Sequence, residues 1–117
     1  MKKLKISVTT DTAGDGSTTA LNLLGKLYGV YWNKGTCDTG VDITLSTVQS
    51  ETARNLLVVA NADASKMYYP RTLQHLDTSG ADLTSHTEPI IAGTAKLVIA
   101  QGGNAKTGAV TLFYTDD

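Results

Sequence analysis

The sequence contains few of the residues that build metal or catalytic sites. Among its 117 residues there are one cysteine, Cys37, and two histidines, His75 and His86. A single thiol cannot form an internal disulfide, and Cys37 has no Cys or His neighbour at metal-ligand spacing. Neither histidine is accompanied by a nucleophile motif such as G-x-S-x-G, and both lie in or beside polar sequence. We therefore expect no metal, no cofactor and no catalytic residues.

Long apolar runs are also missing. No stretch approaches the roughly 20 apolar residues that cross a bilayer, so the sequence predicts no membrane span. The basic start of the chain is not followed by the apolar segment of a signal peptide, because Leu4, Ile6 and Val8 alternate with polar residues. We expect the chain to stay in the compartment where it is made.

A surplus of basic charge is absent. Ten Lys and Arg residues stand against eleven Asp and Glu residues, which gives a formal net charge of −1. Proteins that bind nucleic acid usually carry a basic surplus that neutralises phosphates, so nucleic acid is not an expected partner. The charges are scattered rather than grouped in runs, and they do not identify any other partner.

The sequence does have the pattern of β-strands. Apolar and polar side chains alternate in residues 3–9 and 41–46, which is the period of a half-buried strand. Residues 19–32 also fit a helical stripe, but Gly25 and Gly29 would each cost a helix about 1 kcal/mol relative to alanine. Two strands, or one long bent strand, are therefore predicted there.

The second half of the chain continues the pattern. Residues 55–60 form a short apolar run without alternation, which favours a strand covered on both faces and central in its sheet. Pro70 places residues 66–75 in an edge strand or an extended loop. One or two strands are predicted in residues 90–100 and another in 109–114, paired as a hairpin with a long loop.

These segments add up to an all-β fold. Seven to nine short antiparallel strands separated by frequent turns are typical of a sandwich or small barrel. We predict that residues 1–117 form one domain of this kind.

Two loops resemble parts of known ion or phosphate sites but do not complete them. Asp11, Asp15 and Gly16 match part of a calcium loop, yet Ala13 and Asn22 occupy positions of required acidic ligands, so a plain turn is favoured. Residues 102–108 contain phosphate-loop residue types in the wrong order and precede a strand rather than a helix, which favours a hairpin loop. The acidic pair Asp116 and Asp117 is interpreted as a terminal tail.

Aromatic residues gather at positions 28–32 and 68–69. Most are expected in the core of so small a sandwich, and Trp32 and one of Tyr68 and Tyr69 are expected to be exposed. The predicted partner contacts combine these rings with nearby cations and with the basic start of the chain: Lys2, Lys3, Trp32, Tyr68, Tyr69 and Arg71.

Several segments resemble a set of small virion proteins of tailed bacteriophages, encoded near the major capsid protein. The resemblance covers residues 6–11, 25–30, 39–45, 69–71 and 96–108. It implies a single jelly-roll-like β-sandwich that serves as a capsid cement or decoration protein. Such a protein would be made in the host cytoplasm and bound to the outer capsid surface. The implied partners are the major capsid protein and further copies of the chain, as a dimer or trimer.

Two other functions remain open. A head-tail joining or tail component would also be small, rich in strands and without catalysis. A carbohydrate-binding module would use exposed aromatic rings to hold sugars, and here Trp32 is the ring expected to matter. An enzyme is the least favoured class, since no nucleophile or metal motif is present.

Overall fold

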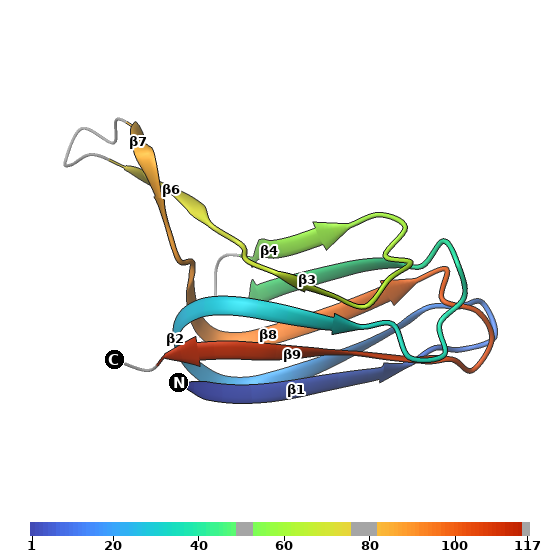
Figure 1. Ribbon diagram of the computed structural model, residues 1–117. Coiled ribbons are helices and arrows are strands. Elements are labelled where there is room, and N and C mark those ends of the chain that lie inside the picture. The colour runs from blue at the N-terminus through green and yellow to red at the C-terminus, as the bar shows by residue number, and fades with distance from the viewer. Residues whose placement is uncertain (49–52, 76–81, 116–117) are drawn as a thin grey trace.

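The protein is an all-β sandwich. The computed structural model describes residues 1–48, 53–75 and 82–115. The strands within these residues are β1 (Lys2–Thr9), β2 (Gly16–Asn33), β3 (Asp42–Val48), β4 (Ala53–Val59), β5 (Lys66–Tyr68), β6 (Thr72–His75), β7 (Asp82–Thr87), β8 (Ile90–Ala100) and β9 (Thr107–Thr115). Every pairing between them is antiparallel, which confirms the predicted fold class (Figure 1).

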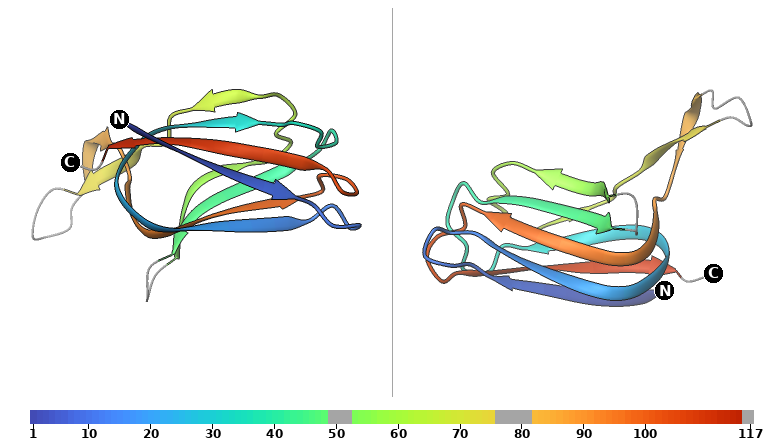
Figure 2. Two further views of the ribbon diagram at one scale, coloured as in Figure 1. Left: turned by 90° about the horizontal axis from the view of Figure 1, so that it is seen from below. Right: turned by 180° about the vertical axis from the view of Figure 1, so that it is seen from behind.

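The two layers of the sandwich come from one sheet that folds over itself. Its strand order is β1-β9-β2-β8-β3-β4, and β5 also pairs with β2. The first part of β2 pairs with β8, and the last part lies between β9 and β5. One layer therefore contains β1, β9, the end of β2 and β5, and the other contains the start of β2, β8, β3 and β4 (Figure 2).

The long strand β2 joins the layers by bending near Lys26. This residue pairs with Ile90 of β8 and also with Thr115 of β9, so the strand changes partners there. A Cβ at the neighbouring Gly25 would overlap the carbonyl oxygen of Thr115, and only glycine allows this approach. The interpretation of residues 19–32 as one long bent strand is thus confirmed.

The interior between the layers is closed by apolar side chains from both. Trp32, Leu27, Leu97 and Leu112 are fully buried, and the indole nitrogen of Trp32 donates a 3.0 Å hydrogen bond to the carbonyl of Ala62. Alternation places these side chains inside, because successive residues of a strand point to opposite faces. The remaining buried apolar residues are Ile6, Val8, Leu23, Val30, Cys37, Val41, Ile43, Leu45, Leu56, Ala62, Ile91, Ala95, Ile99, Ala109 and Val110.

Two predicted strand positions are wrong. Residues 55–60 were expected in a central strand, but β4 ends the strand order and the side chain of Val58 is 62% exposed. The expected hairpin of the last two strands is absent because β8 and β9 lie in different layers, each paired with β2. Of the two interpretations of residues 66–75, an edge strand or an extended loop, the edge strand is confirmed by β5, which among the described strands pairs with β2 alone.

The strands β6 and β7 form a hairpin that stands away from the sandwich (Figures 1 and 2). They carry His75 and His86, whose positions were expected in or beside loops. The polar and turn-rich composition of residues 77–88 predicts a loop, but residues 82–87 of this segment form β7. Residues 76–81 lie outside the described residues, as do Asp116 and Asp117 of the expected acidic tail. Within the described part of the chain, no helix has the length and hydropathy needed to span a membrane.

The connections at the other end of the sandwich bind one another through backbone and side-chain hydrogen bonds. Asp11 accepts hydrogen bonds from the amides of Ala13 and Asp15 at one carboxylate oxygen, which confirms the predicted turn. The amide of Asp38 donates to the carbonyl of Gly102, and the amide of Gly40 donates to the carboxylate of Asp63. Residues 102–106 are therefore part of a packed loop cluster that leads from β8 to β9. The strand expected after this loop is confirmed by β9, but the expected hairpin loop is wrong because β8 and β9 each pair with β2.

Candidate binding surface

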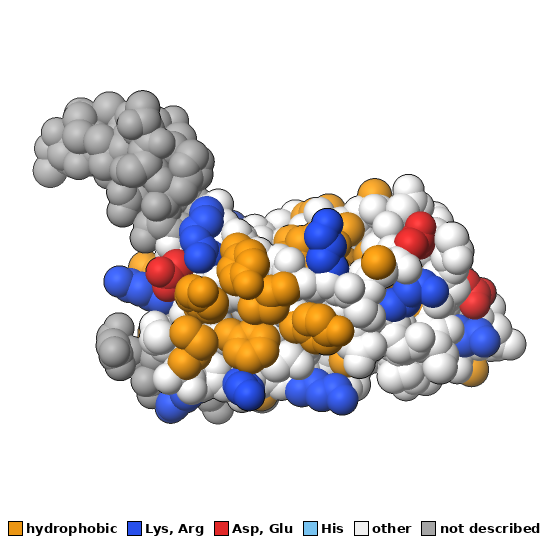
Figure 3. Space-filling model, viewed as in Figure 1, with side chains coloured by type: hydrophobic (Ala, Val, Ile, Leu, Met, Phe, Trp, Pro, Cys, Tyr) orange, Lys and Arg blue, Asp and Glu red, His pale blue; other side chains and the backbone are white. Residues whose placement is uncertain are grey.

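The outer side of the layer β1-β9-β2-β5 carries exposed aromatic and apolar side chains. Directly paired residues of an antiparallel sheet share a face, and here Tyr31 pairs with Thr111 of β9 and Met67 of β5. Phe113 lies two residues further along β9 on the same side. Tyr69, just after β5, is 55% exposed. Figure 3 shows this apolar area on the face where β2 and β9 run.

A β-bulge adds Tyr28 to this surface. Leu27 pairs with Tyr114 and Gly29 with Phe113, so Tyr28 is an extra residue on β2 with no partner of its own. Leu27 is fully buried, whereas Tyr28 is 40% exposed. Its ring meets that of Tyr69 edge to face, with centroids 5.7 Å apart. We call the surface formed by Tyr28, Tyr31, Met67, Tyr69 and Phe113 the aromatic face.

Cations lie at two margins of the aromatic face. At the β1 margin, the Lys3 ammonium is 5.8 Å from the centroid of the Phe113 ring, and Lys5 is also exposed. At the opposite margin, the Arg71 guanidinium is 5.8 Å from the centroid of the Tyr28 ring. Nη1 of Arg71 donates to the carbonyl of Tyr28 at 3.0 Å and to that of Pro70 at 2.7 Å. Arg71 is therefore held in place although it is exposed.

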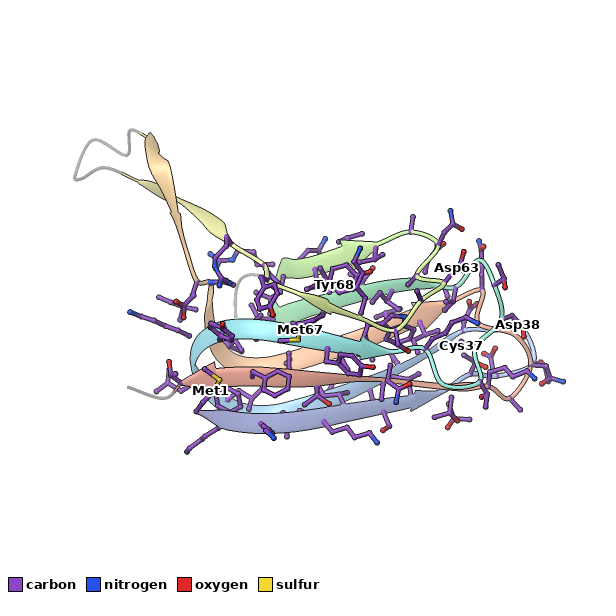
Figure 4. The ribbon with its side chains drawn as sticks, viewed as in Figure 1. Met1, Cys37, Asp38, Asp63, Met67 and Tyr68 are labelled. Atoms are coloured by element: carbon purple, nitrogen blue, oxygen red, sulfur yellow. The ribbon has the colours of Figure 1, made fainter. Side chains whose placement is uncertain are left out.

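The structure brings three of the six predicted partner-contact residues to one surface. Lys3, Tyr69 and Arg71 lie far apart in the chain, and the sheet brings them to the aromatic face. Lys2 is exposed at the start of β1, but alternation turns it away from the side of Lys3. Tyr68 is half-buried against the core, under the ammonium of Lys66 at 5.4 Å (Figure 4).

The expectation that Trp32 is exposed is wrong. Its side chain is 0% exposed, and its N–H is bonded inside the protein. A fully buried ring cannot stack on a ligand or anchor a partner, so Trp32 is a core residue. The expectation that Tyr28 and Tyr31 belong to the core is also wrong, because they are 40% and 39% exposed.

The comparisons with known proteins give a similarity of fold. No protein-family model and no curated protein sequence matches the chain. Among solved structures, it is similar to the carbohydrate-binding module TmCBM61 in complex with β-1,4-galactotriose, with 15% identity, a TM-score of 0.41, and coverage of 93% of this chain and 70% of that one. It is also similar to the CBM32 module of AlyQ in complex with 4,5-unsaturated mannuronic acid, with 9% identity, a TM-score of 0.42, and coverage of 93% and 78%. At such values neither a ligand nor a site is carried over to this chain.

A shallow hollow lies away from the aromatic face. Its volume is about 280 Å³, and it is lined by Asp11, Asp15, Gly16, Ser17, Lys96 and Val98. One carboxylate oxygen of Asp11 already accepts two backbone hydrogen bonds within its own turn. The carboxylate therefore serves the turn at the edge of this hollow, which is consistent with the plain turn predicted from the sequence.

Reactive and metal-binding groups are scarce in the described part of the chain. Burial raises the pKa of the Cys37 thiol above its ordinary value, nearby Asp38 adds to the shift, and Lys34 opposes it. A raised pKa keeps the thiol protonated and weakly nucleophilic. Residues 1–48, 53–75 and 82–115 contain no group of three or more His, Cys, Asp or Glu side chains placed to hold a metal ion.

The aromatic face is thus the surface best suited to binding. Two of its tyrosine rings, Tyr28 and Tyr31, are presented by β2, which is fixed by pairing, and the third, Tyr69, directly follows the paired strand β5. The rings offer flat apolar area with hydroxyl groups at their edges, and the lysine and arginine side chains add hydrogen-bond donors.

Proposed function

We propose that the protein is a non-enzymatic binding domain that holds a carbohydrate chain on its aromatic face. The observation that carries the proposal is the set of exposed tyrosine rings, Tyr28, Tyr31 and Tyr69, on one face of a paired sheet. A sugar ring presents C–H groups on its flat side, and these are attracted to the negative face of an aromatic ring. The sugar hydroxyls then reach the tyrosine hydroxyls and the cations at the margins.

The open form of the aromatic face suits a chain of sugars better than a single one. Tyr31 and Met67 are paired across β2 and β5, and the next residues on this side are Tyr69 and Phe113. A ligand that lies across several rings removes more apolar area from water than one that meets a single ring. We therefore expect affinity to rise with the length of the oligosaccharide.

The first prediction is saturable binding of oligosaccharides by the intact chain. β-1,4-Galactotriose and oligomers of mannuronic acid, which correspond to the sugars in the two similar structures, are suitable first probes within a wider panel. Isothermal titration should give a dissociation constant that tightens from disaccharide to longer chains. Val58→Ala removes an exposed apolar side chain on the other layer and should bind as the unchanged protein does. Absence of binding across the panel, with the fold intact, would remove the proposal.

A protein surface is the second candidate ligand. The aromatic face combines Tyr, Phe, Met and Arg, which are the residue types enriched where proteins meet. With the resemblance to virion proteins, this composition supports the outer surface of a capsid shell of major capsid protein as the partner, bound by single or oligomeric copies. A shell-bound protein would stabilise the shell because each copy adds its binding free energy to the assembled state.

This candidate predicts that the purified chain co-sediments with assembled shells. Replacing Tyr69 and Arg71 together by alanine should lower the bound fraction several-fold, because both lie exposed at the aromatic face. The matched change Lys34→Ala, in a loop at the other end, should leave loading as it was. Equal loading of the Tyr69/Arg71 variant would show that shells are not bound through this face.

A further inference from the structure

The guanidinium of Arg71 is clamped on one side and open on the other. Nη1 gives its hydrogen bonds to the backbone carbonyls of Tyr28 and Pro70. Nε and Nη2 make no hydrogen bond to the described protein, and the side chain is exposed. An arginine fork that presents two parallel N–H groups matches the two oxygens of a carboxylate.

The position of Arg71 links this open edge to the stacking surface. Only Pro70 separates it from Tyr69, the most exposed of the tyrosine rings, and its guanidinium lies over Tyr28. Pro70 fixes its own φ, which limits the movement of Arg71 relative to Tyr69. If a sugar stacks on Tyr69, an acidic group at the edge of that sugar would therefore lie near the fixed guanidinium of Arg71.

The surrounding charge favours the same kind of ligand. Lys3 and Lys5 are exposed at the opposite margin of the aromatic face. Four exposed acids of the described chain, Asp11, Asp15, Asp38 and Asp63, lie in the loops at the far end of the sandwich, where Lys34 and Lys106 accompany them. One described acidic residue, Glu88, does lie near the aromatic face. The carbonyl of the next residue, Pro89, accepts a hydrogen bond from the amide of Leu27 on β2.

From this arrangement we infer that the aromatic face selects an acidic polysaccharide, a polyuronate chain. One uronate carboxylate is held side-on by Nε and Nη2 of Arg71 while its sugar ring stacks on Tyr69, and further carboxylates along the chain approach Lys3 and Lys5. The inference rests on the proposed function and adds the chemical class of the sugar. It predicts selectivity that a tyrosine platform alone would not give.

The test compares two chains that differ only at C6. β-1,4-Mannotetraose carries a hydroxymethyl group at each C6, and the β-1,4-linked mannuronate tetramer carries a carboxylate there. At low salt the mannuronate tetramer should bind about tenfold more tightly, and this ratio should shrink as salt screens the charges. Equal affinity for the two tetramers would overturn the inference and leave the proposed function standing, whereas failure of both to bind would count against each.

Variants of Arg71 separate a shaped carboxylate site from general attraction. Arg71→Gln should reduce the mannuronate-to-mannose affinity ratio from about tenfold to about twofold, the part that Lys3 and Lys5 still supply, and Arg71→Lys should restore only part of the loss, since an ammonium lacks the fork. Lys34→Gln removes one charge at the far end and should keep the ratio. A ratio that falls equally in the Lys34 and Arg71 variants would show that net charge alone decides, and would overturn the side-on site. Thermal unfolding of each variant checks that the fold is kept.

Discussion

Replacing Trp32 by alanine is expected to lower the free energy of unfolding by about 3 to 5 kcal/mol, the usual cost of deleting a large buried ring. The ring is 0% exposed inside the sandwich, and the carbonyl of Ala62 would lose the donor that bonds it. An unpaired buried carbonyl adds to the loss of packing. Urea unfolding at equilibrium measures the change.

Trp32→Phe provides the matched control for this prediction. It keeps much of the apolar volume and removes the N–H, so a loss of about 1 to 2 kcal/mol is expected. Gly108 gives a second check, because a Cβ there would lie 2.5 Å from Cη2 of Trp32. Gly108→Ala should cost about 1 to 3 kcal/mol by overpacking when Trp32 is present, and less when Trp32→Phe has already removed this atom. Additive costs in the double variant would contradict the contact.

The core position of Trp32 could not be read from alternation because the parity of β2 changes along its length. Leu23 and Leu27 are buried, and uninterrupted alternation from them would place Tyr31 inside and Trp32 outside. The bulge at Tyr28 shifts the register by one residue, so Val30 and Trp32 point inside instead. A one-residue shift exchanges the faces of every following side chain.

Other parts of the fold follow directly from local pattern. Strands β1 and β3 are predicted correctly because burial on one face imposes a period of two that no bulge disturbs within residues 3–9 and 41–45. The position of β4 at the end of the strand order is not predicted correctly. A short apolar run can belong either to a central strand or to an edge strand, and the sequence of the run does not distinguish the two. The pairing of β8 could not be predicted from local sequence either. It pairs with β2, about 70 residues earlier, and with β3, and not with β9, which follows it in the chain.

The candidate site shows the same division between local and long-range information. Tyr69 and Arg71 are close in sequence, and an aromatic ring beside a cation in an edge-like segment indicated possible contacts. Phe113 and Met67 join Tyr31 only through the pairing of β9 and β5 with β2, which no local pattern reveals. The signal for Tyr28 was the glycine at position 29, because a bulge is a common reason for glycine inside a strand.

The largest effect on binding is expected from removing Tyr31 and Tyr69 together. Each exposed ring contributes apolar area and stacking worth about 1 to 2 kcal/mol, so the double change to alanine should weaken oligosaccharide binding roughly 100-fold. The two side chains lie on the outer side of the sheet, so the free energy of unfolding should change far less than for Trp32→Ala.

Phenylalanine at the same two positions distinguishes stacking from hydrogen bonding. If the rings carry the interaction, the Tyr31→Phe and Tyr69→Phe double variant keeps most of the affinity, and only the part due to the hydroxyls is lost. Titration of these proteins and of the single variants Tyr31→Ala and Tyr69→Ala with one tetrasaccharide measures both steps. Because Tyr31 is on β2 and Tyr69 follows β5, a loss that is larger for the double alanine variant than for either single one shows that a ligand spans the two strands. A double alanine variant that binds as tightly as the unchanged protein would place the ligand elsewhere on the sandwich.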